Sequence, residues 1–121
     1  MLKKILVADD DADIRNLLME TLTEEGYEVT GAADGKEAIQ KIEQNLFDLL
    51  VLDIEMPYFN GYQVADQIQA KWRTRPPKIM ILTGHSIPEE GSAAILSGAS
   101  AFVQKPCNLD FLVKKVKEII G

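Results

Sequence analysis

The sequence has a single cysteine, no long apolar run and fewer basic than acidic side chains. The cysteine, Cys107, can form neither an internal disulfide nor a thiolate metal cage, which agrees with a reducing compartment. No apolar run approaches the roughly 18 residues of a membrane span. Behind the two lysines of Met1 to Lys4, the apolar run Ile5 to Ala8 is too short for a secretory signal. We therefore expect a cytoplasmic protein that does not associate with membranes.

The charge balance argues against nucleic-acid binding. The chain carries 13 basic and 19 acidic side chains, for a formal net charge of -6. The short basic segment from Lys71 to Arg75 ends a predicted helix, where cations complement the helix dipole. We interpret this segment as structural and expect no direct contact with nucleic acid. The net charge favours cations or basic partner surfaces.

Length and hydrophobic pattern favour one α/β domain, which we place at residues 1–121. Stretches with helical spacing separate five apolar or β-branched runs that we predict as strands: Lys4 to Ala8, Glu28 to Ala32, Leu49 to Leu52, Lys78 to Leu82 and Ala101 to Val103. Strand and helix thus alternate five times with short connections. This alternation predicts a doubly wound, five-stranded parallel sheet covered by five helices.

Capping residues and apolar spacing locate the predicted helices. One set of apolar residues at helical spacing should form the buried face of the first helix: Ile14, Leu17, Leu18 and Leu22. Asp34 with Glu37, and Ser86 with Glu89, resemble capping boxes that start the second and fourth helices. The last helix should start at Asn108.

Polar residues follow four of the five predicted strands. Asp9 and Asp10 follow the first strand and Asp53 the third, while Thr83 and Lys105 follow the fourth and fifth. Open parallel sheets bind ligands outside the carboxyl ends of their strands. We therefore expect these five side chains to converge on one crevice.

The acidic residues of this crevice predict a divalent cation. Three carboxylates destabilise one another unless a cation lies among them, and oxygen ligands suit Mg²⁺ or Mn²⁺. Asp11 and Asp13 lie further on, where a helix N-terminus favours negative charge without any metal. A solvated helix start also explains Asp9 and Asp10 when they are considered alone. Asp53 favours the metal site, because a carboxylate that ends a buried strand needs partners.

A divalent cation beside a carboxylate, a lysine and a hydroxyl predicts phosphoryl transfer. Asp53 would attack as the nucleophile and become an acyl phosphate, while Lys105 neutralises the phosphoryl oxygens and Thr83 donates to one of them. Each residue alone has a simpler interpretation, since Thr83 can merely end a strand and Lys105 can be a solvated loop lysine. Their common position at strand ends favours the phosphoryl site.

The motifs that carry these residues resemble those of the receiver domains of two-component response regulators. They are the acid pair in "KILVADDDADIR", then "LDIEMPYFNG", "ILTGH" and "FVQKP". The resemblance, closest to chemotaxis receivers, implies a flavodoxin-like fold with strand order 2-1-3-4-5. It implies that Asp53 is the phosphoacceptor and that Lys105 pairs with the phosphoryl group. It also implies that Asp9, Asp10 and the backbone carbonyl of Glu55 hold the metal ion with Asp53.

The resemblance further implies a conformational switch. Thr83 corresponds to the switch hydroxyl, and Phe102 corresponds to the switch aromatic, which is often a tyrosine in this family. Phe102 keeps the bulk of that residue without its hydroxyl. Packing in the core is an equally good interpretation of Phe102 from the sequence alone. We expect Gly61 to supply a turn or a left-handed conformation beside the site.

The sequence therefore predicts a phosphoacceptor switch of a phosphorelay. A histidine kinase or histidine phosphotransfer protein would phosphorylate Asp53, and the face from the fourth to the fifth helix would contact a downstream protein or a linked output domain. Catalysis would be limited to the domain's own phosphorylation and dephosphorylation, and we expect a monomer. Two alternatives are a Mg²⁺-dependent hydrolase that works through an aspartyl phosphate and a phosphorylation-independent interaction module.

Overall fold

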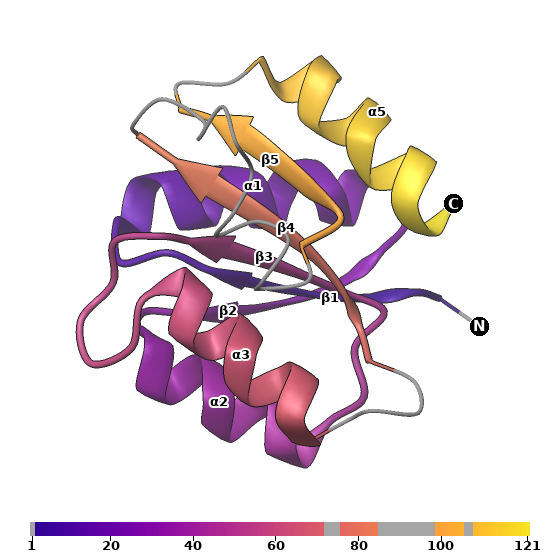
Figure 1. The fold of residues 1–121 in the computed structure, drawn as a ribbon. Coiled ribbons are helices and arrows are strands. Elements are labelled where there is room, and N and C mark those ends of the chain that lie inside the picture. The colour runs from indigo at the N-terminus through magenta and orange to yellow at the C-terminus, as the bar shows by residue number, and fades with distance from the viewer. Residues whose placement is uncertain (1, 72–75, 85–98, 106–107) are drawn as a thin grey trace.

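Each strand except the fourth is followed by a described helix in the computed structural model, which describes residues 2–71, 76–84, 99–105 and 108–121 (Figure 1). The strands are β1 Lys4–Ala8, β2 Glu28–Ala32, β3 Leu49–Asp53, β4 Lys78–Thr83 and β5 Ala101–Gln104. The helices are α1 Ala12–Glu24, α2 Gly35–Gln44, α3 Gly61–Lys71 and α5 Leu109–Ile120. All strand pairs are parallel, and the sheet order is β2-β1-β3-β4-β5. The predicted fold class and strand order are confirmed.

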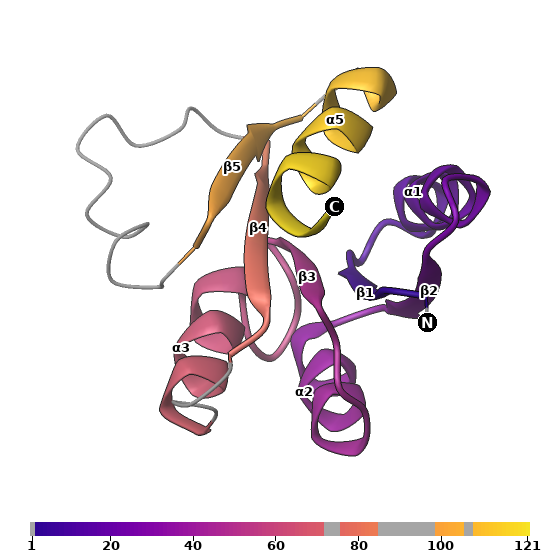
Figure 2. The ribbon, with the colours of Figure 1, turned by 90° about the vertical axis from the view of Figure 1, so that its right-hand side faces the viewer.

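Helices cover both faces of the sheet. Figure 2 shows α1 and α5 on one face and α2 and α3 on the other. Alternate residues of the central strands pack into two separate cores, with Val7 and Val51 beneath α1 and α5, and Leu6 and Leu50 on the opposite face. Every residue of β3 is buried. The central strands are therefore packed on both faces, and the residues at their ends lie at one edge of this packed sheet.

The helix caps follow the predicted pattern. The Asp11 side chain accepts hydrogen bonds from the backbone N–H groups of Asp13 and Ile14 at 2.9 and 3.2 Å. Asp11 is thus the N-cap of α1 and Asp13 lies in its first turn, which confirms that both acids belong to a helix start. Asp34 caps α2 by accepting from Glu37 N at 2.8 Å. Asn108 caps α5, as predicted.

The predicted buried face of α1 contains one error. Leu18 and Leu22 are buried and Ile14 packs against them, but Leu17 is 49% exposed. Each step of four residues advances about 40° around a helix, so Ile14, Leu18 and Leu22 form a narrow stripe. Leu17 lies about 100° from Leu18 and points away from the sheet.

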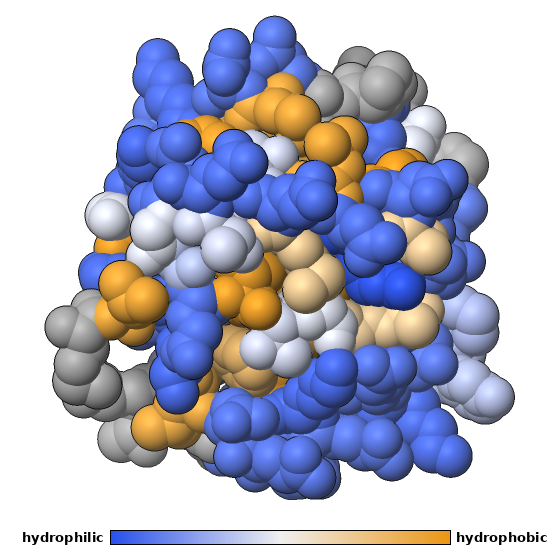
Figure 3. Space-filling view, turned by 180° about the vertical axis from the view of Figure 1, so that it is seen from behind, coloured by the Kyte–Doolittle hydropathy of each residue, from blue (hydrophilic) through white to orange (hydrophobic). Residues whose placement is uncertain are grey.

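The edge strand β2 is covered by long side chains. The Lys41 ammonium donates to the carbonyl oxygen of Gly31, and Lys41 also pairs with Glu37 at 2.9 Å. A Cβ atom on Gly31 would lie 2.7 Å from the Met19 sulfur and 3.4 Å from Cδ of Arg15. Figure 3 views this side and shows a band of apolar and weakly polar residues between two hydrophilic areas. Side chains from α1 and α2 thus protect an edge that is otherwise open to strand pairing.

Several predictions concern residues outside the described ranges. These are the fourth helix with its cap at Ser86 and Glu89, the segment 72–75 and Cys107. Within the described part of the chain, no helix is long and apolar enough to cross a membrane.

Candidate functional site

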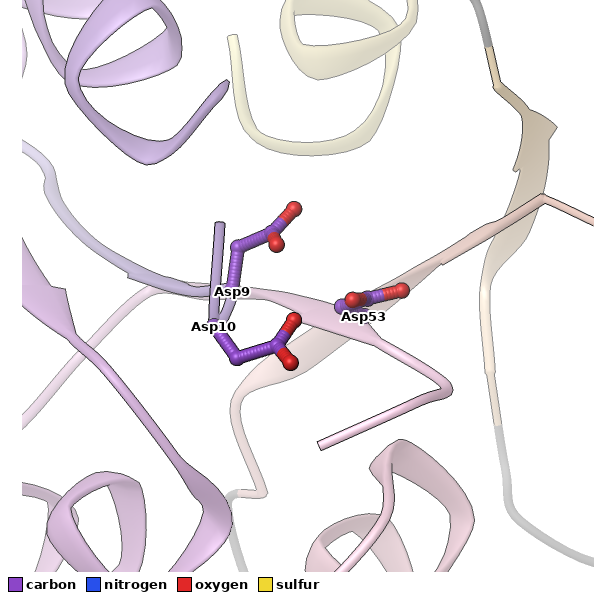
Figure 4. Close-up of side chains that lie close together, drawn as sticks. All are labelled: Asp9, Asp10 and Asp53. Atoms are coloured by element: carbon purple, nitrogen blue, oxygen red, sulfur yellow. The ribbon is translucent and has the colours of Figure 1, made fainter. Parts of the chain in front are cut away.

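Three carboxylates converge at the carboxyl ends of β1 and β3. One carboxylate oxygen from each of Asp9, Asp10 and Asp53 lies within 4.8 Å of the other two (Figure 4). Asp9 is fully buried and Asp53 is 5% exposed, whereas Asp10 is exposed. The topology explains this convergence, because adjacent parallel strands place their last residues at the same edge of the sheet.

Four contacts fix the polar groups of Asp9. Its backbone N–H donates to Ala32 O at 3.1 Å, and its carboxylate accepts from Asp11 N at 2.9 Å and from Lys105 Nζ at 2.6 Å. Its carbonyl oxygen accepts from Arg15 Nη1 at 2.8 Å. The partners come from β2, α1 and the end of β5, so Asp9 joins three parts of the fold.

Lys105 bridges the two buried carboxylates. Its ammonium lies 2.6 Å from an oxygen of Asp9 and 3.4 Å from an oxygen of Asp53. Burial alone would lower the pKa of Lys105, but the hydrogen bond to Asp9 and the charges of both carboxylates outweigh it and raise the pKa. Lys105 is therefore cationic and half-neutralises this pair of acids.

Asp53 remains electrostatically unfavourable in spite of Lys105. Burial, followed by the nearby charge of Asp9, raises the pKa of Asp53 from 3.8 to about 6. Lys105 and a hydrogen bond from the backbone of Glu55 oppose this rise without cancelling it. The positive charge of Lys105 thus compensates the ionised Asp53 carboxylate only in part.

The donor set fits Mg²⁺ or Mn²⁺. Asp9, Asp10 and Asp53 offer only oxygen ligands, and exposed Asp10 leaves one side of the cluster open to water. Hard divalent cations that keep several waters bind through a few carboxylates in this way. The raised pKa of Asp53 also favours a cation at this site, because positive charge there would stabilise the ionised carboxylate.

The loop after Asp53 is held close to the strand end. Gly61 opens α3, and a Cβ atom there would lie 2.7 Å from the carbonyl oxygen of Asp53. Of the two expectations for Gly61, a turn or a left-handed conformation, the second is wrong, since the φ of Gly61 is not positive. Glycine is needed for this close approach of backbone to backbone. The positive φ in this loop belongs to Tyr58, at 70°.

The two predicted switch residues lie on neighbouring strands. Thr83 ends β4 and pairs in register with Gln104 of β5, and its side chain lies outside the described part of the structure. Phe102 is half-buried beside the core that faces α2 and α3. Its ring centroid lies 6.5 Å from that of Tyr62 in α3, with a 39° interplanar angle. Phe102 thus combines core packing with contact to an element that begins beside the site.

A family model for the response regulator receiver domain matches residues 5–117. The chain belongs to this family. Receiver domains are signalling domains of two-component systems, so the predicted family is confirmed.

Curated relatives of this receiver domain are bacterial regulators. It is similar to the transcriptional regulatory protein PdtaR of Mycobacterium tuberculosis, with 36% identity over 116 residues that cover 95% of this chain and 55% of PdtaR. It is also similar to the uncharacterized transcriptional regulatory protein YrkP of Bacillus subtilis, with 37% identity over 116 residues, 96% of this chain and 48% of YrkP. The chain therefore spans about half the length of these relatives.

Solved structures of similar receivers agree over nearly the whole chain. The response regulator TrrA from Thermotoga maritima, in complex with Mg(2+)-BeF, is 42% identical with a TM-score of 0.86, covering 98% of this chain and 99% of TrrA. The Vibrio cholerae chemotaxis protein CheY4 is 31% identical with a TM-score of 0.91, again covering 98% and 99% of the two chains.

Two contacts of this receiver domain were not predicted. From the sequence, no role was assigned to Arg15, which lies within the first predicted helix. In the structure, its side chain reaches back six residues and donates to the Asp9 carbonyl. Tyr62 was not singled out, although it follows Gly61 and its ring lies near that of Phe102. A basic residue one turn after an acidic N-cap was the available signal for Arg15.

Proposed function

We propose that this chain is a phosphoacceptor switch in which Asp53 receives a phosphoryl group from a histidine kinase or histidine phosphotransfer protein. The observation that supports it is the position of Asp53 at the end of β3, within reach of Asp9, Asp10 and Lys105. A nucleophile, a set of metal-binding oxygens and a protonated lysine are the parts that phosphoryl transfer to a carboxylate requires.

Asp9, Asp10, Asp53 and the backbone carbonyl of Glu55 would hold a Mg²⁺ ion, or Mn²⁺ in its place. When bound, the ion supplies positive charge to the equatorial oxygens of the phosphoryl group. Asp10 would bind from the solvent side, because it is the exposed member of the cluster. The buried Asp9 would bind from the sheet side.

Asp53 acts as the nucleophile in its ionised form. Its carboxylate oxygen attacks the phosphorus of a phosphohistidine, a P–O bond forms, and the electron pair of the breaking P–N bond returns to the imidazole. With a pKa of about 6, Asp53 is mostly ionised near neutral pH. Lys105 keeps its proton throughout and shifts its contact from the Asp53 carboxylate to the phosphoryl oxygens.

The phosphorylated state would act through the ends of β4 and β5. A phosphoryl oxygen on Asp53 gives the Thr83 hydroxyl an acceptor, and Phe102 follows on the adjacent strand. Phosphorylation needs to favour the active arrangement by only a few kcal/mol to repopulate it. A downstream protein or a linked output domain would bind the face that includes α5 (Leu109–Ile120). We further infer a monomeric, cytoplasmic receiver domain at residues 1–121, without direct contact to nucleic acid.

Intact-mass spectrometry after incubation with acetyl phosphate tests this function. The wild type should gain a single phosphoryl group in the presence of Mg²⁺ and none in EDTA, and Asp53→Asn should gain none in either condition. The absence of an adduct, even with a histidine kinase donor, would favour the interaction module instead. Multiple turnover of a phosphomonoester would favour the hydrolase.

A further inference from the structure

Arg15 connects helix α1 to the carbonyl group of a site carboxylate. Its Nη1 atom donates a hydrogen bond of 2.8 Å to the backbone oxygen of Asp9, in a partly buried position. The side chain passes over Gly31 of β2, where the missing Cβ leaves room for it, with Arg15 Cδ 3.4 Å from the place a Cβ would occupy. Arg15 is half-buried along this path. The contact is thus part of the packed edge of the domain.

The oxygen that accepts from Arg15 belongs to the peptide group between Asp9 and Asp10. Peptide groups are planar, so the direction of this carbonyl also sets where the next Cα begins. Asp9 has three further polar contacts that hold it in place. Asp10 is exposed, and no side chain within the described residues pairs with its carboxylate. The position of the Asp10 carboxylate therefore depends on its backbone.

We propose that Arg15 is a positioning residue for the divalent cation site, because it orients the Asp9–Asp10 peptide and thereby holds the Asp10 carboxylate toward Asp9 and Asp53. This inference rests on the proposed metal-dependent function. Residues that orient metal ligands commonly change metal affinity by roughly 10-fold or more when they are removed. Arg15 acts on a backbone carbonyl rather than on the carboxylate, so we expect about a threefold to tenfold effect.

A positioning role and a simple charge effect predict opposite results. Arg15 is a cation near a site that binds a cation, so loss of its charge alone would tighten Mg²⁺ binding, by about twofold at physiological salt. Loss of the hydrogen bond would instead let the Asp9–Asp10 peptide rotate and weaken binding. The sign of the change in Kd therefore distinguishes the two effects.

Isothermal titration calorimetry with MgCl₂ on the full chain tests the proposal. The variants are Arg15→Met, which keeps the length and apolar stem but removes charge and donor, and Arg15→Lys, which keeps the charge and one donor. Lys41→Met is the matched control, because Lys41 also donates to a backbone carbonyl, that of Gly31, and pairs with Glu37 on the same edge. Urea unfolding in EDTA shows whether each variant is folded under the titration conditions.

We expect Arg15→Met to raise the Kd for Mg²⁺ by about threefold to tenfold, while Lys41→Met stays near the wild-type value. Arg15→Lys should bind more tightly than Arg15→Met, although its positive charge opposes binding. An unchanged or lower Kd in Arg15→Met, or weaker binding by Arg15→Lys than by Arg15→Met, overturns the proposal. Failure of the wild type to bind Mg²⁺ would overturn the proposed function itself, which separates the two results.

Should Arg15→Met prove unfolded, amide chemical shifts decide the question on Arg15→Lys and Arg15→Gln. Both variants keep a donor on a shorter side chain. A positioning role predicts that the Asp10 and Asp11 amide resonances move in the metal-free protein, while those of β3 do not. Unmoved Asp10 and Asp11 resonances in these variants would equally overturn the proposal.

Discussion

Replacing Asp53 with asparagine, its neutral isostere, should stabilise the metal-free protein. Burial and the charge of Asp9 raise the pKa of Asp53 from 3.8 to about 6. Each unit of pKa shift corresponds to about 1.4 kcal/mol, so the penalty for ionised Asp53 reaches about 3 kcal/mol at most. Asp53 shares Lys105 with Asp9, so Asp53→Asn also removes one ion-pair partner of Lys105. This loss offsets part of the expected gain in stability. We expect Asp53→Asn to increase the free energy of unfolding by about 2 kcal/mol near neutral pH.

The sign of the pH dependence follows from the direction of this shift. The folded state binds the Asp53 proton more tightly than the unfolded state, so this residue lowers stability as pH rises from 3.8 through about 6. Below this window both states are protonated and the penalty is absent. Above it the penalty is complete. The stability difference between Asp53→Asn and wild type should therefore be small near pH 4 and reach its full value above pH 7, roughly.

Urea unfolding in EDTA, monitored by far-ultraviolet circular dichroism at about pH 4 and above roughly pH 7, measures this difference in the free energy of unfolding. In thermal unfolding near neutral pH, the same stability difference should raise the Tm of Asp53→Asn by roughly 6–10 °C. Asp66→Asn is the control, because Asp66 is an exposed acid on α3, and it should change stability by less than about 0.5 kcal/mol. Mg²⁺ at about 100 times its Kd should stabilise the wild type by about 2.7 kcal/mol and Asp53→Asn by less. Equal or lower stability of Asp53→Asn near neutral pH would refute the reasoning.

Three further predictions address the surroundings of this carboxylate. If Asp53 accepts the phosphoryl group as proposed, Glu55→Ala should change the half-life of the phosphorylated protein by about threefold or more, because the Glu55 side chain lies exposed two residues beyond Asp53. Identical decay curves for the two proteins would contradict this. Lys105→Met should destabilise the metal-free protein by about 2–4 kcal/mol, since it removes the ammonium that pairs with the fully buried Asp9 carboxylate. The same variant should bind Mg²⁺ more tightly in a calorimetric titration, and weaker binding would show that Lys105 does not compete for Asp9. Gly61→Ala should cost about 1–3 kcal/mol in urea unfolding, because the new Cβ would lie 2.7 Å from a backbone oxygen of β3. Gly84→Ala, with no heavy atom within 4 Å of its Cβ position, is the control, and an equal cost in both variants would contradict the steric argument.

Strand ends made most of the site predictable from the sequence. The apolar runs that became β1 and β3 are short and end in acids, so their direction and pairing place Asp9, Asp10 and Asp53 together. The prediction needed no knowledge of side-chain conformation. It depended only on the rule that parallel strands end at one edge of a sheet. The same rule placed Lys105 near these acids although 96 residues separate it from Asp9.

Contacts that depend on side-chain paths were not predictable in this way. The sequence predicted that Lys105 faces a phosphoryl group, but its tightest contact in the structure is the Asp9 carboxylate. The role of Arg15 depends on the space above Gly31, which periodicity does not reveal. From the sequence, Gly61 was explained by the conformational freedom of glycine. In the structure, glycine is needed because a Cβ at this position would lie 2.7 Å from the carbonyl oxygen of Asp53. Each case involves the distance between two segments after folding, and local sequence pattern carries no such distance.

The charges of the site provide a physical reason for a switch. Three ionised carboxylates and the Lys105 ammonium leave two negative charges in excess, which one bound divalent cation would neutralise. In the proposed reaction the single charge of Asp53 is replaced by the two charges of an acyl phosphate, so the balanced site gains one negative charge. Lys105 and the ion are already engaged, and further compensation must come from polar groups at the ends of the neighbouring strands. The end of β4 beside Asp53 carries the Thr83 hydroxyl, and β5 next to it carries Phe102. In the proposed reaction the added negative charge would therefore act on the polar groups at these strand ends, which gives a physical reason for the proposed switch.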